Sequence, residues 1–185
     1  METRCLEKGF VVWFTGLPGS GKTTIASRLA ERLRSLGYRV ELLDGDWARR
    51  TISEGAGFTR EERLRHLKRV AWVARLLARN GVIVLCSFVS PYEEARRLVR
   101  SIVEEEGIPF ILVWVKASPE TAAKRKPELW EKAKKGEIKH FTGVSDPYEP
   151  PSNPDLVIDT ERVGVEEGVE AVFKLLEGRG LVAKA

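Results

Sequence analysis

The chain has 185 residues, with 43% hydrophobic and 31% charged side chains and a formal net charge of +4. This balance excludes an intrinsically disordered protein, and no apolar run approaches the ~20 residues that span a bilayer, so no membrane partner is expected. Because no signal-peptide pattern follows Met1, we expect a cytoplasmic protein with one domain over residues 1–185.

The excess of positive charge is small, and the basic residues are scattered among acidic ones. No run of aromatic and basic side chains offers a platform for nucleic-acid bases. A pocket for polyanionic small molecules explains the charge equally well. We therefore expect no nucleic-acid partner.

Five apolar runs, rich in Val, Ile and Leu and without polar alternation, are typical of parallel strands covered on both faces. Between them, apolar residues recur at i, i+3, i+4 and i+7, which indicates helices around residues 25–36, 64–77, 98–103 and 165–176. This alternation predicts a doubly wound α/β fold with a five-stranded parallel sheet. The predicted strands are residues 10–15, 39–43, 82–88, 110–115 and 156–159.

The first apolar run is followed by Gly-Leu-Pro-Gly-Ser-Gly-Lys-Thr-Thr at residues 16–24, which matches the P-loop pattern G-x-x-x-x-G-K-S/T. Its glycines let backbone N–H groups surround an anion, and the next helix N-terminus adds partial positive charge. Lys22 is expected to reach the β- and γ-phosphates of ATP, and the Thr23 hydroxyl to bind Mg²⁺. A ligand-free glycine turn is the weaker alternative. The predicted ATP-binding residues are Gly16, Gly19, Ser20, Gly21, Lys22, Thr23 and Thr24.

The second strand ends in Asp44-Gly45-Asp46, at the edge where doubly wound sheets bind ligands. One carboxylate there could hold the hydration shell of Mg²⁺ while the other takes a proton from an acceptor hydroxyl. We assign Asp44 to the metal and Asp46 to the hydroxyl, although the reverse remains open. A plain turn is the structural alternative.

Thr59-x-x-Glu62 is a capping box, so a helix is expected to begin there. Phe58, just before it, could stack on a base or act as a hydrophobic staple, and the pattern does not separate these. Arg63 and His66 are three residues apart and share a helix face, which could bind substrate or be solvated. The apolar Trp72 on the same helix leaves a homodimer open.

Ser90-x-x-Glu93 is a second capping box, and Pro91 and, further on, Pro119 suit first helical turns. No base stands beside Ser90 in the sequence to activate it as a nucleophile. Direct in-line phosphoryl transfer needs no covalent step. We therefore expect Ser90 to be an N-cap that also touches substrate or metal, rather than a nucleophile.

Residues 125–154 are rich in Lys, Glu, Pro and Gly and carry no strand signal. A polar stretch of this length inside a compact domain is usually functional. We interpret about 125–150 as a lid that closes over nucleotide and excludes water. A surface excursion without a role is the alternative.

In order and spacing, these motifs resemble those of the adenylylsulfate kinase (APS kinase) family over about residues 9–160. The combination of D-G-D, G-F-T, S-F-V-S-P-Y and F-T-G is more specific than the P-loop. The resemblance implies a P-loop kinase of sulfate assimilation that transfers the ATP γ-phosphate to the 3′-hydroxyl of adenosine 5′-phosphosulfate (adenylyl sulfate, APS). The matching segments are residues 16–24, 43–46, 57–59, 62–63, 87–92, 133–138, 141–143 and 146–151.

The resemblance also implies roles for individual positions. Asp46 would face the 3′-hydroxyl, and Arg49 and Arg63 would bind the phosphosulfate. Phe58 would stack on the adenine of APS, and Phe141 would cover its other face. The implied ATP-base residue is Arg125, and the further implied substrate residues are His66, Val89, Ser90 and Lys126.

The sequence departs from the family pattern at Trp47 and His66, where the family usually has Asn, and at His140, where it usually has Gly. The lid is one residue shorter, so the family's substrate-contacting lysine has no direct match and Lys126 is its candidate replacement. Two other functions stay open: another small P-loop kinase for a nucleoside or sugar acid, and a nucleotide-sensing module without catalysis.

Overall fold

All five predicted strands are present and parallel, with ends within one residue of the expected ones. The computed structural model describes residue 4 and residues 6–183. The sheet order is β2-β3-β1-β4-β5, so β1 with its P-loop occupies the centre. The strands are β1 (Val11–Thr15), β2 (Val40–Asp44), β3 (Ile83–Ser87), β4 (Phe110–Lys116) and β5 (Leu156–Asp159).

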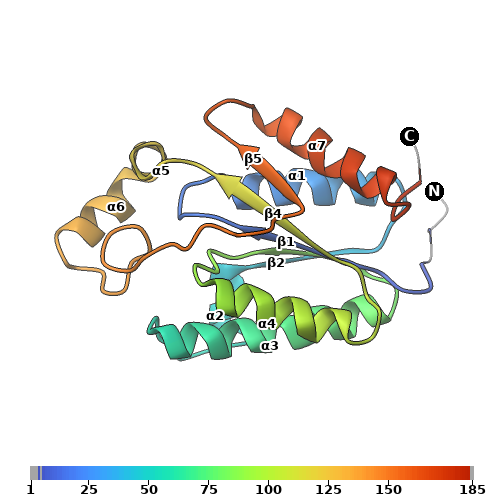
Figure 1. Ribbon diagram of the computed structural model, residues 1–185, viewed down its shortest axis with the longest axis horizontal. Helices are drawn as coiled ribbons and strands as arrows, with labels where there is room; N and C mark the ends of the chain where they lie inside the picture. Colours follow the sequence, from blue (N-terminus) through green and yellow to red (C-terminus); the bar gives the residue numbers. More distant parts are fainter. Residues whose placement is uncertain (1–3, 5, 184–185) are drawn as a thin grey trace.

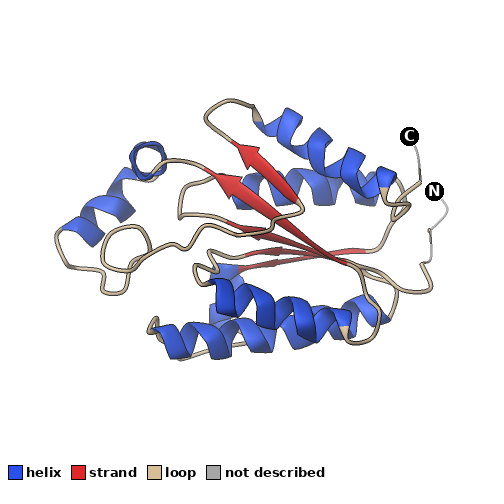
Figure 2. Cartoon of the chain, viewed as in Figure 1, coloured by secondary structure: helices blue, strands red, loops and turns tan. Residues whose placement is uncertain are grey.

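Helices cover both faces of the sheet (Figure 1). One face carries α1 (Lys22–Ser35) and α7 (Val165–Gly178), and the other carries α3 (Arg60–Arg79) and α4 (Glu93–Glu104). The short helices α5 (Pro119–Arg125) and α6 (Pro127–Lys134) lie beyond the carboxyl ends of the strands (Figure 2). These layers confirm the doubly wound α/β fold.

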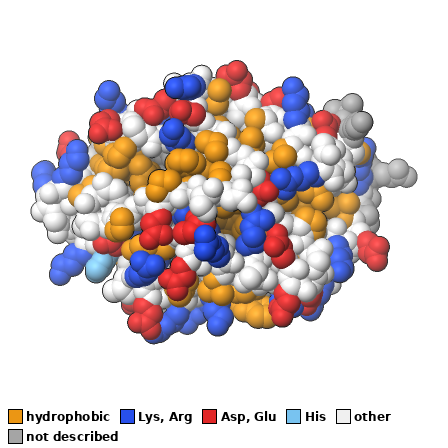
Figure 3. Space-filling model, viewed as in Figure 1, with side chains coloured by type: hydrophobic (Ala, Val, Ile, Leu, Met, Phe, Trp, Pro, Cys, Tyr) orange, Lys and Arg blue, Asp and Glu red, His pale blue; other side chains and the backbone are white. Residues whose placement is uncertain are grey.

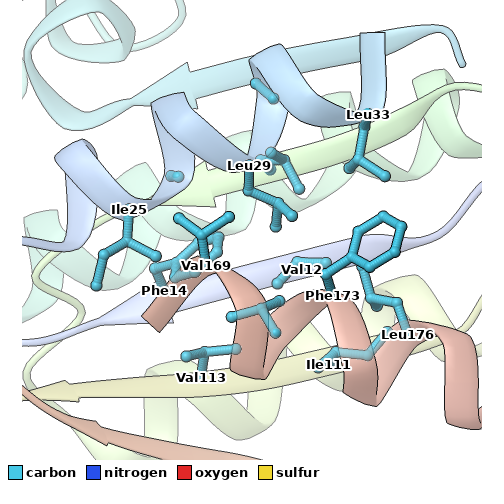
Figure 4. Packing of buried hydrophobic residues seen from close by; sticks show 14 of the residues in the cluster. Val12, Phe14, Ile25, Leu29, Leu33, Ile111, Val113, Val169, Phe173 and Leu176 are labelled. Atoms are coloured by element: carbon cyan, nitrogen blue, oxygen red, sulfur yellow. The ribbon is translucent and has the colours of Figure 1, made fainter. Parts of the chain in front are cut away.

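Strand alternation divides the core in two. On β1, Val12 and Phe14 face one side, while Val11 and Trp13 face the other, and all four are fully buried. Figure 4 shows the first core, in which side chains of α1 and α7 meet those of β1 and β4, with Phe173 of α7 near its centre. Because both sheet faces are covered, the strands read as continuous apolar runs.

A third, smaller core lies in the predicted lid region. Trp130 and Phe141 pack edge-on with ring centroids 5.2 Å apart, together with Ala122, Ala133 and Leu17 of the P-loop. The Trp130 indole Nε1 also donates to the carbonyl oxygen of Pro18 at 2.9 Å. The polar stretch therefore contains a helix and apolar anchors that its composition does not reveal.

Two helix starts are as predicted. Thr59 accepts from the Glu62 N–H while the Glu62 carboxylate accepts from the Thr59 N–H, a complete capping box. Pro119 occupies the first turn of α5.

The predicted Ser90 N-cap is wrong, because α4 begins at Glu93 and its N-cap is Tyr92. Pro91 consequently lies before the helix. Instead of capping, the Ser90 hydroxyl donates to the Phe88 carbonyl at 3.1 Å and accepts from Trp13 Nε1 at 3.1 Å. A tertiary contact with the buried indole thus overrides the local S-P-x-E pattern.

Basic and acidic side chains alternate over the face of the molecule shown in Figure 3. Among residue 4 and residues 6–183, no helix has the length and apolar composition required to cross a bilayer.

Candidate active site

A cavity of about 780 Å³ lies at the carboxyl ends of the central strands. The walls come from the turn between β2 and α2 (Gly45–Arg50), the N-terminus of α3, the segment after β3, the P-loop and the predicted lid region. It brings together most of the predicted site residues, namely Lys22, Thr23, Asp44, Asp46, Arg49, Phe58, Arg63, His66, Val89, Ser90, Lys126 and Phe141.

The P-loop backbone has the geometry of an anion cradle. Gly19 and Gly21 have φ of 94° and 98°, a left-handed conformation that favours glycine. A Cβ on Gly19 would also lie 2.6 Å from the carbonyl oxygen of Ala122. The first turn of α1 contains no acidic residue, so nothing there competes with a bound phosphate for its N–H groups.

Lys22 lies over this cradle with its ammonium group buried. Its Nζ donates to the Leu17 carbonyl oxygen at 3.1 Å. Burial, with a smaller contribution from Lys126, lowers the pKa of Lys22 to about 7, while the charge of Asp46 acts in the opposite direction. The ammonium thus lacks a strong anionic partner until a polyanion enters the cavity.

The two aspartates have different surroundings. Asp44 ends β2, and its Oδ1 accepts from the Trp47 N–H at 2.9 Å, which makes it the N-cap of α2 (Gly45–Arg50). Asp46 is exposed in the first turn of that helix and lines the cavity. The sequence interpretation missed α2, because the motif was considered only as ligands or a turn.

Oxygen donors suited to Mg²⁺ meet beside the P-loop. The Thr23 hydroxyl lies 2.8 Å from Ser87 Oγ, and the Asp44 carboxylate lines the same cavity. Among the described residues no group of three or more His, Cys, Asp or Glu could hold a metal on its own. The oxygens of Thr23 and Asp44 nevertheless fit Mg²⁺, because in kinases this ion takes one or two protein oxygens together with substrate phosphates and waters.

Two arginines surround Phe58, which is 47% exposed. The Arg49 guanidinium lies 4.0 Å from the Phe58 ring centroid and donates to the Ala56 and Gly57 carbonyl oxygens. Arg63 donates through Nε to the Phe58 carbonyl at 2.8 Å and through Nη2 to the His140 carbonyl of the lid. Burial lowers the pKa of both guanidinium groups.

His66 lies behind these arginines and is 3% exposed. Its ring contacts Phe88 edge-on, and Nδ1 is buried without a hydrogen-bond partner in the described chain. Burial, followed by the charge of Arg49, lowers its pKa to about 4, so the imidazole is neutral at pH 7.

Other predicted residues lie at the edges of the site. Arg125 does not line the main cavity and donates instead to the Ser20 carbonyl at 3.1 Å and to the Thr160 hydroxyl at 2.8 Å. Thr24 is exposed on α1. Phe141 reaches the cavity from its contact with Trp130, rather than from a face-to-face position on Phe58.

The cavity also contains residues that the sequence analysis did not select. Ser87 is the last residue of β3 and bonds Thr23, so the rule that ligands meet at strand carboxyl ends could have found it. Thr142 lines the cavity with a buried Oγ1 that has no partner in the described chain. Its place in the F-T-G motif, beside Phe141, could have marked it.

The family model for adenylylsulphate kinase matches residues 8–159, which contain the P-loop, both aspartates and the lid. The chain belongs to this family. A probable adenylyl-sulfate kinase of Aeropyrum pernix is 67% identical over 94% of this chain and 96% of its own. An adenylyl-sulfate kinase of Halothermothrix orenii is 46% identical over 95% and 94%.

Among solved structures, an APS kinase of Mycobacterium tuberculosis in complex with AMPPNP and APS has a TM-score of 0.90 and 38% identity. The match covers 93% of this chain and 99% of that one. The fold of this adenylylsulphate kinase family member is therefore shared with a relative whose structure holds both an ATP analogue and APS.

Proposed function

We propose that this ATP-dependent kinase of the adenylylsulphate kinase family uses the 780 Å³ cavity to transfer the ATP γ-phosphate to the 3′-hydroxyl of adenylyl sulfate. The products are 3′-phosphoadenylyl sulfate and ADP. The observation that carries the proposal is the presence of Lys22, Asp46 and Phe58 in one cavity. These provide a phosphate-binding cation, a proton acceptor and an aromatic face for a base.

The sheet order supports a division of the cavity into two sides. Segments after β4 and β5, with Arg125 and Thr160, adjoin the P-loop on one side. Segments after β2 and β3 adjoin it on the other, where Phe58, Arg49 and Arg63 lie. ATP is proposed to extend toward β5, and the acceptor nucleotide toward β2.

The proposed chemistry is positioning and charge neutralisation. Lys22 and the backbone N–H groups of residues 19–23 hold the phosphates and stabilise charge on the transferred group. Asp46 accepts the proton of the 3′-hydroxyl, because Asp44 is engaged as the N-cap of α2. Arg49 and Arg63 place two cations beside the acceptor's phosphosulfate. The Ser90 hydroxyl, bonded on both sides, acts as an anchor and not as a nucleophile.

Mg²⁺ is the proposed cofactor, with Thr23 and Asp44 as the residues that would hold it directly or through water. When bound with ATP, it would neutralise negative charge on the phosphates. The lid, about residues 125–150 of a single kinase domain spanning 1–185, is proposed to cover the nucleotides and exclude water. Arg63 of α3 already donates a hydrogen bond to the carbonyl oxygen of His140 in this proposed lid.

A homodimer in the cytoplasm, where ATP is available, is the proposed working form. Trp72 and Leu76 are 43% and 46% exposed, one turn apart on α3, and offer an apolar surface for a second copy. Light scattering of the wild type and of Trp72→Glu tests this: a dimer that becomes a monomer supports it, and a monomeric wild type overturns it.

The activity is tested by ADP release with ATP and Mg²⁺, comparing adenylyl sulfate with AMP, adenosine and gluconate as acceptors. We expect a large preference for adenylyl sulfate and a loss of about 10²–10⁴ in kcat for Asp46→Ala. Lys22→Ala should abolish turnover. Lys174→Ala and Glu166→Ala are matched controls, because they remove the same charges at exposed positions of α7 outside the cavity.

Strong turnover on gluconate or adenosine would instead assign the chain to another class of small-molecule kinase. Tight ATP binding with no acceptor phosphorylated would favour a nucleotide-sensing module. The complete P-loop motif in the sequence, and the presence of Lys22 and both aspartates in the cavity, argue against that module.

A further inference from the structure

Arg96 of α4 is a charged residue in the protein interior that the proposed chemistry does not use. It is only 2% exposed and ranks among the largest fully buried side chains. A buried cation is costly unless hydrogen bonds and opposite charge compensate it. Its contacts therefore indicate what the buried charge achieves.

The guanidinium group joins three segments of the chain. Nη1 donates to the Ser90 carbonyl oxygen at 2.7 Å, and Nη2 donates to the Glu149 carbonyl oxygen at 2.6 Å and to Glu93 Oε2 at 2.7 Å. Nε is buried without a partner in the described chain. The side chain thus connects the segment after β3, the first turn of α4 and the chain that returns from the lid.

The first of these segments, residues 88–92, is called here the Ser90 loop. Ser90 lines the cavity and has φ of 41°, a left-handed conformation that a non-glycine residue adopts only when its surroundings enforce it. Its hydroxyl is fixed by Trp13 and by the Phe88 carbonyl. The hydrogen bond from Arg96 fixes its carbonyl, so the peptide group is restrained as well as the side chain.

The second partner, residues 148–149, is the returning end of the lid. The Glu149 N–H donates to the Pro91 carbonyl at 2.8 Å, and its Oε2 accepts from the Glu93 N–H at 2.8 Å. The Tyr148 hydroxyl lies 3.0 Å from Thr15 Oγ1, and the Tyr148 ring lies 5.7 Å from the Arg96 guanidinium carbon. The lid is consequently fastened to the same loop that lines the acceptor side.

We propose that Arg96 is a positioning residue that holds the Ser90 loop and the returning end of the lid in one relative arrangement. This role rests on the proposed function in one respect only, namely that the acceptor side is the part of the cavity that depends on Arg96. Arg96 does not line the cavity. Without its two nitrogens the Ser90 peptide relaxes from its strained conformation and the lid loses one of its attachments.

The test compares Arg96→Met with Arg75→Met. Arg75 is a matched control, because it is also a buried arginine and does not line the cavity. It lies toward the C-terminal end of α3 and is bonded to Glu105, Glu106 and the Ile102 carbonyl. Hydrogen–deuterium exchange of both variants is followed by mass spectrometry. We expect faster exchange in residues 88–92 and 146–151 of Arg96→Met, with those segments unchanged in Arg75→Met.

Steady-state kinetics supply the second readout. Arg96→Met should lower kcat/KM for adenylyl sulfate on the order of tenfold to hundredfold, because small misplacements near the chemistry are costly. The KM for ATP should stay within about twofold. Arg96→Lys should recover part of both readouts, since lysine keeps the charge but replaces two positioned nitrogens with one.

The proposal is overturned if exchange in the two segments is the same in Arg96→Met and Arg75→Met, or if the KM for both substrates changes equally. If Arg96→Met does not fold, Arg96→Lys is compared with Arg75→Lys, and the same exchange and KM criteria decide. A wild type inactive on adenylyl sulfate would refute the proposed function. The exchange experiment would still decide the role of Arg96.

Discussion

Acid should destabilise this protein through one histidine. His66 is 3% exposed, and its pKa of about 4 lies well below its ordinary value of 6.5, because burial and neighbouring arginines disfavour the imidazolium. Between pH 6.5 and 4, His66 binds a proton in the unfolded chain but not in the folded chain, so the unfolding free energy falls as the pH falls. Lowering the pKa of His66 from 6.5 to about 4, at 1.36 kcal/mol per pKa unit, corresponds to a loss of about 3 kcal/mol of unfolding free energy by pH 4.

Urea unfolding of the wild type and of His66→Asn, measured from pH 7.5 to 4, isolates this contribution. Asparagine is polar and of similar size but does not titrate, while all carboxylates remain common to both proteins. We expect the difference in unfolding free energy between the two proteins to change by about 3 kcal/mol across the window. Parallel pH profiles would show that the imidazole is solvated or paired in the folded protein, and would refute the argument.

Three further predictions follow from the packing and from Lys22. Phe173→Ala, in the core between α1 and α7, should lower the unfolding free energy by about 3–5 kcal/mol in urea titrations, and a loss below about 1 kcal/mol would contradict the packing. Gly19→Ala should weaken ATP binding in calorimetry, because its Cβ would lie 2.6 Å from a backbone carbonyl oxygen and its φ is 94°. Gly178→Ala, with open space around it, is the control and should bind ATP as the wild type does. ATP binding at pH 8 should take up a proton, because the polyphosphate restores the charge of Lys22, whose pKa is about 7 without ligand. Calorimetry in buffers of different ionisation enthalpy measures this uptake, which Lys22→Met should remove.

Much of the fold follows from periodic patterns in the chain. The strand ends agree within one residue because buried parallel strands are uninterrupted apolar runs between polar turns. The capping box at Thr59 was predictable because both partners lie within one turn. The P-loop was predictable because its spacing is set by backbone geometry around an anion.

Apart from the missed helix α2, whose cap is local, the errors come from contacts between residues distant in sequence. Ser90 matched a local cap pattern, but the Trp13 indole, 77 positions away, holds its hydroxyl. The lid core was missed because Trp130 and Phe141 are separated by a mostly polar stretch and pack together, with the P-loop residue Leu17, only in the folded chain. The predicted aromatic sandwich of Phe58 and Phe141 stays a prediction, since both rings reach the cavity without stacking on each other.

The lid core has a consequence for exchanging parts between related kinases. Because Leu17 belongs to the P-loop and packs inside the lid core, the lid is not a separable module. A chimera that receives a relative's lid but keeps its own residue at position 17 would pack a P-loop residue from one kinase against lid residues that evolved in another. Successful transplants should carry Leu17 and the Pro18 carbonyl environment along with the lid, so that specificity and phosphate binding are inherited together.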